Sequence, residues 1–129
     1  MGDVSELRVV LTVSDFDAAL AFYRDALGLD QVADWSSDEG RVVLLDGGRA
    51  RLELFDEAQA GTVDRIEAGS RVSGTVRLAV EVGDSDSTAR RLVAAGAAEV
   101  APPVDTPWGD RNARVRTPDG TQLTLFTVG

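Results

Sequence analysis

The sequence predicts an α+β domain built from two copies of one module, each reading as a strand, a helix and three further strands. Residues 9–17 and 78–86 both have an alternating apolar run followed by an acidic turn. The module ends also match, because Leu-Glu-Leu-Phe at 52–55 returns as Leu-Thr-Leu-Phe at 123–126. A repeat of about 70 residues is longer than a solenoid unit, which favours two modules in one domain. We therefore expect a single domain over residues 1–129, with modules at about 5–56 and 74–128.

The first module begins with an alternating strand at residues 8–13. Ser14 or Asp15 is placed to cap the helix that follows, and Gly28 to end it in the left-handed conformation. The apolar residues between them recur at helical spacing: Phe16, Leu20, Tyr23 and Leu27. Strands are expected near 30–35, 40–46 and 50–56, the last two joined by a glycine turn.

The second module repeats this order after a polar connection at residues 57–73, to which we assign no element. A strand is expected at 75–82, and Asp84 or Ser85 caps a helix that Gly96 ends. The remaining strands are expected at the following ranges: 98–102, 110–117 and 121–127.

Side chains on the predicted strands separate into an aliphatic face and a mixed face. The aliphatic face should pack beneath the helices. The mixed face carries charged, polar and aromatic residues, and it would either meet solvent or curve around a groove. Phe55 and Phe126 hold the same place on this face in both modules, which favours the groove.

Composition excludes several function classes. The chain has no cysteine and no histidine, so it lacks thiol chemistry, the commonest metal ligand and the usual acid–base group near neutral pH. Its net charge of −9 argues against nucleic acid and anionic membranes as partners. With no apolar run long enough to span a bilayer and no signal-peptide pattern at the start, we expect a cytoplasmic protein.

Three segments resemble the vicinal oxygen chelate superfamily of glyoxalases, bleomycin-resistance proteins and extradiol dioxygenases. They are the run from Val13 to Leu29, the run Pro107-Trp108-Gly109-Asp110-Arg111, and the run Thr117-Pro118-Asp119-Gly120-Thr121. The resemblance implies two tandem βαβββ modules that form a cupped mixed sheet around a central cleft. It also implies a homodimer, some related proteins sharing ligand grooves between subunits.

Catalytic members of that superfamily hold a divalent metal through four positions, one on the first and one on the last strand of each module. Carried over, these positions are Arg8, Glu53, Arg77 and Thr124. Two guanidinium groups would stand where metal ligands belong, and arginine stays protonated. We therefore predict no metal and no other cofactor, with Arg8 or Arg77 neutralising Glu53. That ion pair would either fill the old site or contact a ligand.

The two tryptophans are the other candidate ligand contacts. Trp35 and Trp108 lie at roughly equivalent places near the rims of the two modules, where family members often line the groove with aromatic residues. They could instead pack against a second subunit or plug the cup. Asp110 is expected to belong to a turn at the solvated surface.

The sequence favours a metal-free protein that binds and sequesters an aromatic natural product or antibiotic, closest in character to bleomycin-resistance-like proteins. The predicted ligand contacts, none of them catalytic, are Arg8, Trp35, Glu53, Phe55, Arg77, Trp108, Thr124 and Phe126. The alternative is a metal-independent lyase, isomerase or cyclase with Glu53 as base. A carboxylate paired with arginine should have a lowered pKa and be a poor base, which counts against this alternative. A third possibility is a degenerate enzyme retained as a partner-binding domain.

Overall fold

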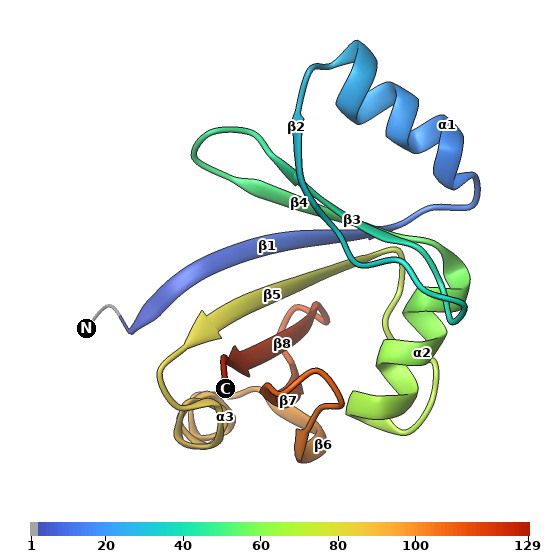
Figure 1. The fold of residues 1–129 in the computed structure, drawn as a ribbon. Coiled ribbons are helices and arrows are strands. Elements are labelled where there is room, and N and C mark those ends of the chain that lie inside the picture. The colour runs from blue at the N-terminus through green and yellow to red at the C-terminus, as the bar shows by residue number, and fades with distance from the viewer. Residues whose placement is uncertain (1–2) are drawn as a thin grey trace.

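The computed structural model describes residues 3–129 and has the predicted α+β class, with one eight-stranded, mixed, curved and open sheet and three helices (Figure 1). Along the sheet the strands lie in the order β2-β3-β4-β1-β5-β8-β7-β6. The strands are β1 (Val4–Thr12), β2 (Asp30–Asp34), β3 (Val42–Asp46), β4 (Arg51–Phe55), β5 (Val76–Val82), β6 (Ala98–Asp105), β7 (Arg111–Arg116) and β8 (Gln122–Thr127). The helices are α1 (Phe16–Leu20), which continues as the π-helical turn η1 (Ala21–Ala26), α2 (Glu57–Ala68) and α3 (Ser85–Ala94).

The strand register repeats between the two halves of the chain. β1 pairs in parallel with β4, with Val10 opposite Glu53, and β5 pairs in parallel with β8, with Ala79 opposite Thr124. β1 and β5 pair antiparallel at the centre of the sheet, so that Arg8 lies opposite Ala79 and Val10 opposite Arg77. The sequence repeat is therefore a structural repeat about an approximate twofold axis between β1 and β5.

Each half buries its aliphatic face against its own helix, as expected. Phe16 and Leu20 of α1 pack on the strand residues Val43, Leu45 and Leu54. The corresponding core of the second half joins α3 to the outer faces of the strands through Val80, Val82, Ala89, Ala113, Val115 and Leu125. Burial of these apolar side chains supplies the main favourable contribution to folding.

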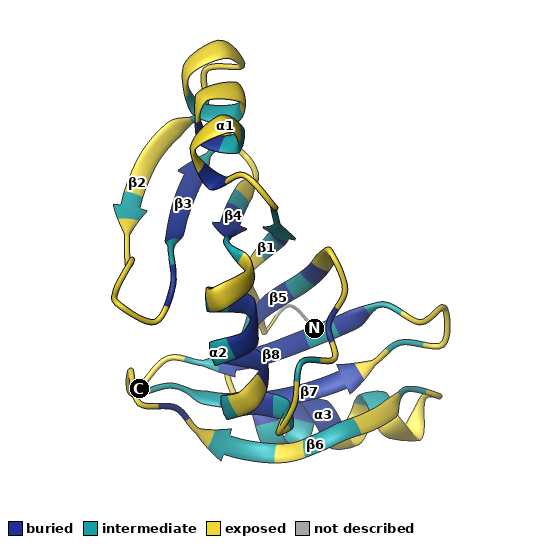
Figure 2. Ribbon diagram, turned by 90° about the vertical axis from the view of Figure 1, so that its right-hand side faces the viewer, coloured by how far each residue is buried: buried dark blue, intermediate teal, exposed yellow. Residues whose placement is uncertain are grey.

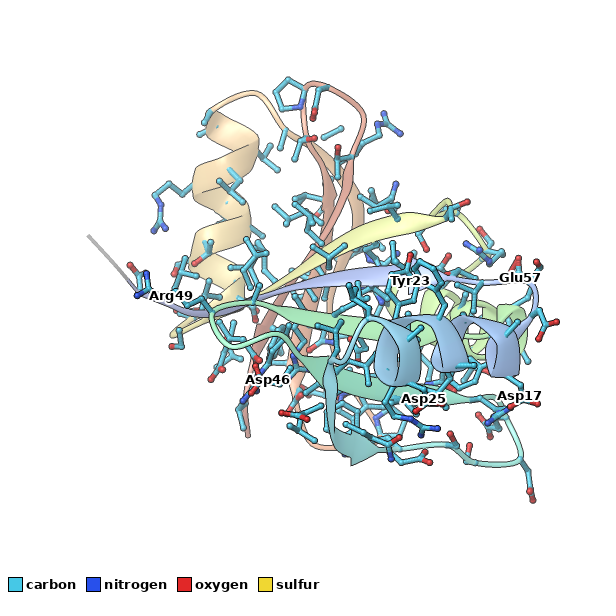
Figure 3. All side chains as sticks on the ribbon, turned by 90° about the horizontal axis from the view of Figure 1, so that it is seen from above. Asp17, Tyr23, Asp25, Asp46, Arg49 and Glu57 are labelled. Atoms are coloured by element: carbon cyan, nitrogen blue, oxygen red, sulfur yellow. The ribbon has the colours of Figure 1, made fainter. Side chains whose placement is uncertain are left out.

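The first helix differs from its prediction at its C-terminal end. Leu27 was expected on the buried side, but it is 61% exposed. The N–H of Leu27 donates to the carbonyl oxygen of Phe22 at 2.8 Å, five residues back, so the last turn is wider than an α-helical turn. The extra residue rotates Leu27 away from the sheet. Figure 3 shows Asp17 and Asp25 along the solvent-exposed side of this helix.

The polar connection contains a helix that the sequence reading did not assign. Asp56 caps α2 by accepting from the backbone N–H of Gln59 at 2.8 Å, and Gly69 ends it with a φ of 84°. α2 lies between the two halves of the sheet (Figure 2), on the face opposite α1 and α3. Ala60 and Val63 of α2 pack with Phe55 and Phe126, which forms a third apolar cluster on the mixed face.

The ends of the sheet are the edge strands β2 and β6. β6 carries Pro102 and Pro103, and an edge strand tolerates proline because one side of its backbone needs no partner. None of the described helices is long and apolar enough to cross a membrane, and the longest, α2, has 12 residues.

Candidate functional site

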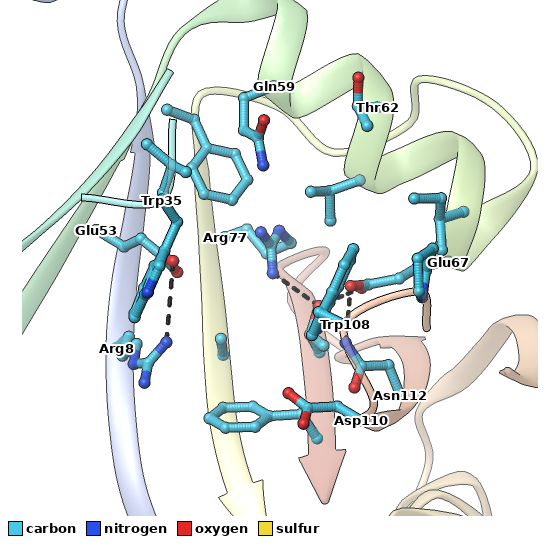
Figure 4. A pocket seen from close by; sticks show the side chains of 18 of the residues that line it. Arg8, Trp35, Glu53, Gln59, Thr62, Glu67, Arg77, Trp108, Asp110 and Asn112 are labelled. Atoms are coloured by element: carbon cyan, nitrogen blue, oxygen red, sulfur yellow. Dashed lines mark hydrogen bonds and ion pairs between the residues drawn. The ribbon is translucent and has the colours of Figure 1, made fainter. Parts of the chain in front are cut away.

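The mixed face of the sheet encloses a cavity of about 580 Å³ between its two halves and α2 (Figure 4). This volume lies in the range of small-molecule sites. All of the ligand contacts predicted from the sequence line it: Arg8, Trp35, Glu53, Phe55, Arg77, Trp108, Thr124 and Phe126. The groove interpretation of the mixed face is therefore the one that the structure adopts.

Aromatic side chains from both halves form the walls of the cavity. Phe55 and Phe126 are 5% and 7% exposed and hold matching register positions on β4 and β8. Trp35 follows β2, and Trp108 lies in the turn between β6 and β7; they are 50% and 49% exposed. The tryptophans thus stand at the rim and the phenylalanines on the floor, so one flat ligand could contact both kinds of surface.

The first half contributes a loosely joined ion pair. Arg8 Nη1 lies 3.8 Å from Glu53 Oε2, whereas Arg8 Nη2 lies 2.8 Å from Glu6 Oε1. The guanidinium of Arg8 also stands 5.5 Å from the ring centre of Trp35 and 5.3 Å from that of Phe126. The predicted pairing of Glu53 with Arg8 is present. The closer partner of Arg8 is Glu6, which was not predicted from the sequence.

Burial raises the pKa of the Glu53 carboxyl, although Arg77 and Arg8 oppose the shift. This direction is opposite to the one expected from the sequence. Removing the carboxylate from water destabilises its charged form by more than the attraction of the two arginines stabilises it. Among residues 3–129 no hydrogen-bond donor contacts the Glu53 carboxylate. The lowered pKa expected for Glu53 is therefore wrong, and it no longer counts against Glu53 as a base.

Arg77 is the second cation of the cavity and is only 5% exposed. Its Nη1 donates to Thr124 Oγ1 at 2.8 Å, and its guanidinium lies 5.4 Å from the ring centre of Phe55. It forms no direct ion pair with a carboxylate of the described residues, so it does not neutralise Glu53 by contact. Burial lowers the pKa of Arg77, as expected for a cation removed from water.

A buried network on the second half was missed in the sequence. Arg114 is fully buried and donates to Asp64 Oδ1 at 2.8 Å and to Glu67 Oε1 at 2.7 Å, both on α2. Thr124 Oγ1 donates to Glu67 Oε1 at 3.0 Å and accepts from Arg114 Nε at 3.1 Å. Asn112 Nδ2 completes the network by donating to Glu67 Oε2 at 2.8 Å. Glu67 and Asn112 line the cavity, as does Asp110, which was expected at the surface.

The network fixes α2 on the sheet through charged hydrogen bonds. Burial alone would raise the pKa of Asp64, but hydrogen bonds from the Ser73 backbone and from Arg114 hold it well below its usual range. A signal for Arg114 was available, since the alternation along β7 places it on the same face as Thr124, its partner in the register. Its carboxylate partners had no such signal, because α2 was not expected.

Comparison with known proteins agrees with this architecture. The model of the Glyoxalase/Bleomycin resistance protein/Dioxygenase superfamily matches residues 7–125. The chain belongs to this superfamily. The uncharacterized protein YraH of Bacillus subtilis is 28% identical over 126 residues, which cover 95% of this chain and 97% of that protein.

Solved structures of the superfamily fold superpose over nearly the whole chain. Methylmalonyl-CoA epimerase from Mycobacterium tuberculosis has a TM-score of 0.68 at 25% identity, covering 98% of this chain and 90% of that one. A glyoxalase/bleomycin resistance protein/dioxygenase superfamily member from Vibrio splendidus has a TM-score of 0.65 at 17% identity, covering 95% and 97%. The similar structures therefore include an enzyme and a protein whose name states no activity.

The residues at the superfamily's metal positions do not fit a divalent cation in this chain. Arg8 and Arg77 carry positive charge, and the Thr124 hydroxyl is already engaged by Arg77, Arg114 and Glu67. Within residues 3–129 no cluster of three or more His, Cys, Asp or Glu side chains is arranged to hold a metal ion. Zn²⁺ or Fe²⁺ would need three or four neutral or anionic donors, which these four positions do not supply.

Proposed function

We propose that the protein is a metal-free binding protein that holds an aromatic small molecule of the natural-product or antibiotic type. The observation that carries this proposal is the cavity wall, where Trp35, Trp108, Phe55 and Phe126 from both halves surround one space of about 580 Å³. Such a wall suits a flat aromatic compound of drug-like size.

Ring stacking and apolar burial would supply most of the affinity. Each favourable aromatic pair adds about 0.5–1.5 kcal/mol beyond the burial of its area. The half-exposed tryptophans can approach a ligand from the rim without rebuilding the core. Polar groups of the ligand would reach the guanidiniums of Arg8 and Arg77 on the floor.

The polar groups of the second half support binding over turnover. Thr124 and Glu67 are committed to Arg77, Arg114 and Asn112 by hydrogen bonds of 2.7–3.1 Å. Groups held in this way keep their geometry, and three of the about four acceptor positions of the Glu67 carboxylate are already used. These residues can shape a ligand site without reacting with the ligand.

A metal-independent enzyme is the second candidate, and one observation favours it. Glu53 lines the cavity, its pKa is raised by burial, and Arg77 and Arg8 stand near enough to influence its charge. A carboxylate of this kind can take a proton from a carbon or oxygen acid while the arginines stabilise the resulting anion. The likeness to methylmalonyl-CoA epimerase makes proton abstraction next to a carbonyl the reaction class to test.

One experiment separates the two candidates. Trp35 and Trp108 are the two tryptophans of the chain, and both line the cavity, so their fluorescence should change when an aromatic compound enters. Each compound that quenches the fluorescence is then recovered and weighed by mass spectrometry after incubation in D₂O buffer. Unchanged mass supports sequestration, whereas deuterium uptake that the Glu53→Gln variant abolishes supports the enzyme. The homodimer expected from the family resemblance stays a prediction, which sedimentation equilibrium can test.

A further inference from the structure

Arg77 is a buried cation that faces the cavity without a carboxylate in direct contact. It is 5% exposed and donates one hydrogen bond, from Nη1 to the neutral hydroxyl of Thr124 at 2.8 Å. Figure 4 shows its guanidinium on the floor of the cavity, between Glu53 and the second half.

Two neighbouring arginines on this face are paired differently. Arg114 lies between Asp64 at 2.8 Å and Glu67 at 2.7 Å. Arg8 lies 2.8 Å from Glu6 and 3.8 Å from Glu53. Arg77 is therefore the one of these three whose positive charge has no partner at contact distance among the described residues.

Burying an unpaired charge is costly, and a guanidinium has a planar fork of N–H donors that matches two oxygens at once. At Arg77 a single donor is used by the protein, and the ring of Phe55 lies beside the group with its centre 5.4 Å away. A ligand with an anionic oxygen group next to an aromatic ring could pair with the guanidinium of Arg77 and contact the ring of Phe55. Carboxylate, sulfonate and phosphate share this chemistry.

We infer that the ligand is an aromatic anion whose acidic oxygen group binds Arg77 while its ring lies against the aromatic wall. This inference rests on the proposed function, since it assigns the charged end of a ligand already placed in the cavity. The net charge of the chain is −9, so the anion would be held by the local positive charge of Arg77 and not by the overall charge of the protein.

The neighbouring carboxylates permit an anion at this place. The two oxygens of Glu67 are occupied by Arg114, Thr124 and Asn112. The pKa of Glu53 is raised by burial, so Glu53 can take up a proton when a second negative charge arrives. The groups that face Glu53 are Arg8 and Glu6 on β1, Arg77 on β5 and Glu67 on α2.

A matched pair of fluorescent probes tests the inference. 8-Anilinonaphthalene-1-sulfonate carries the anion, and N-phenyl-1-naphthylamine lacks only the sulfonate. We expect the wild-type protein to bind the sulfonate at least tenfold more tightly than the neutral probe. Arg77→Met should remove this preference, so that the two probes bind with similar affinity, and Arg77→Lys should retain part of it. Arg116→Met is the control, because it makes the same change of net charge at an exposed position away from the cavity.

Each outcome decides one of the two claims. If the wild type shows no preference, or Arg77→Met keeps it, the anion site is wrong and the aromatic cavity stands. If neither probe binds to the wild type and neither quenches its tryptophan fluorescence, the proposal that the cavity binds aromatic compounds is wrong, and so is the anion site. Near-ultraviolet circular dichroism of each variant verifies native packing, and if Arg77→Met is unfolded, the preference measured with Arg77→Lys decides.

Discussion

The two halves of the cavity have the same strand register but differ in how their polar side chains are bonded. On β3 of the first half, Leu44 lies opposite Glu53, whereas on β7 of the second half, Arg114 lies opposite Thr124. The first half leaves Glu53 without a hydrogen bond from the described residues and holds it 3.8 Å from Arg8. The second half connects every member of its network by bonds of 2.7–3.1 Å.

This difference separates two tasks within one sheet. Buried side chains that are all joined to one another by hydrogen bonds hold one arrangement, so the second half supports α2. A carboxylate and a guanidinium with unused bonding capacity can instead respond to a ligand, so the first half and Arg77 are suited to contact it. Corresponding positions of a repeat thus need not keep corresponding roles.

Replacing Arg114 should have the largest effect on stability, because it breaks the hydrogen-bonded network of the second half. Arg114→Met leaves Glu67 buried without a cation and leaves Asp64 with Arg71 alone, whose Nη1 lies 3.1 Å from Asp64 Oδ2. Breaking such a buried pair costs about 3–5 kcal/mol of unfolding free energy. Chemical denaturation measures the loss. Arg116→Met on the same strand is exposed and should change stability by less than about 0.5 kcal/mol. A loss at Arg114 no larger than at Arg116 would contradict the structural role of the network.

The contact between α2 and the first half should be the next most sensitive. A methyl group at Gly40 would lie 2.5 Å from the Gln59 Cα, so Gly40→Ala should push α2 away and cost about 1–3 kcal/mol from crowding. Gly48→Ala is a matched control, since Gly48 also has a positive φ, of 91°, but has no atom within 4 Å of the added group. Thermal unfolding compares the two variants, and equal losses would show that backbone strain alone is responsible.

Removing the charge of Glu53 should stabilise the protein. Because the folded-state pKa of Glu53 lies above 4.5, its carboxyl binds a proton more tightly when folded, and wild-type stability falls as pH rises through that raised pKa. Glu53→Gln should therefore have a larger free energy of unfolding than the wild type at pH 7, and the difference should shrink as the pH falls toward 4.5. Denaturation across this pH range tests the prediction, and a less stable variant at pH 7 would overturn the raised pKa.

The rim should contribute least to stability and most visibly to binding. Trp35→Ala removes the contact between the Trp35 ring and Arg8, where the guanidinium lies 5.5 Å from the ring centre, and should cost at most about 1 kcal/mol. The same change should weaken the binding of an aromatic ligand by about tenfold, because one stacking contact is lost. Trp35→Phe keeps a ring and should restore most of the binding, as measured by fluorescence of Trp108. Unaltered affinity in Trp35→Ala would remove this residue from the site.

Much of the fold and of the cavity lining could be predicted from the sequence. Phe55 and Phe126 share a register position because parallel pairing of β1 with β4 and of β5 with β8 repeats the same offset. Alternation along these strands then places Glu53 and Thr124 on the same face as the two phenylalanines. These signals are local, and the strand period of two residues preserves them.

The missed features depend on contacts between distant residues. The packed side of α2 has few apolar residues, and these are small, so the segment lacks the pattern of an amphipathic helix. From the sequence Asp64 and Glu67 are typical of solvated acids, because their partner Arg114 lies 50 residues after Asp64. The pKa direction of Glu53 depends on its burial in the folded protein, which the residue types alone do not reveal. The π-helical turn that exposes Leu27 likewise has no pattern in the sequence.

One helix on a two-part sheet has a stereochemical consequence. An approximate twofold axis between β1 and β5 relates the strands of the two halves, but α2 binds the halves differently. Asp64 and Glu67 of α2 pair with Arg114 in the second half, whereas Thr62 Oγ1 donates to the Glu39 carbonyl oxygen in the first half at 3.1 Å. The enclosed space therefore has no internal mirror or rotation symmetry. A ligand with unlike ends should enter in one orientation, and the two enantiomers of a chiral compound should bind with unequal affinity.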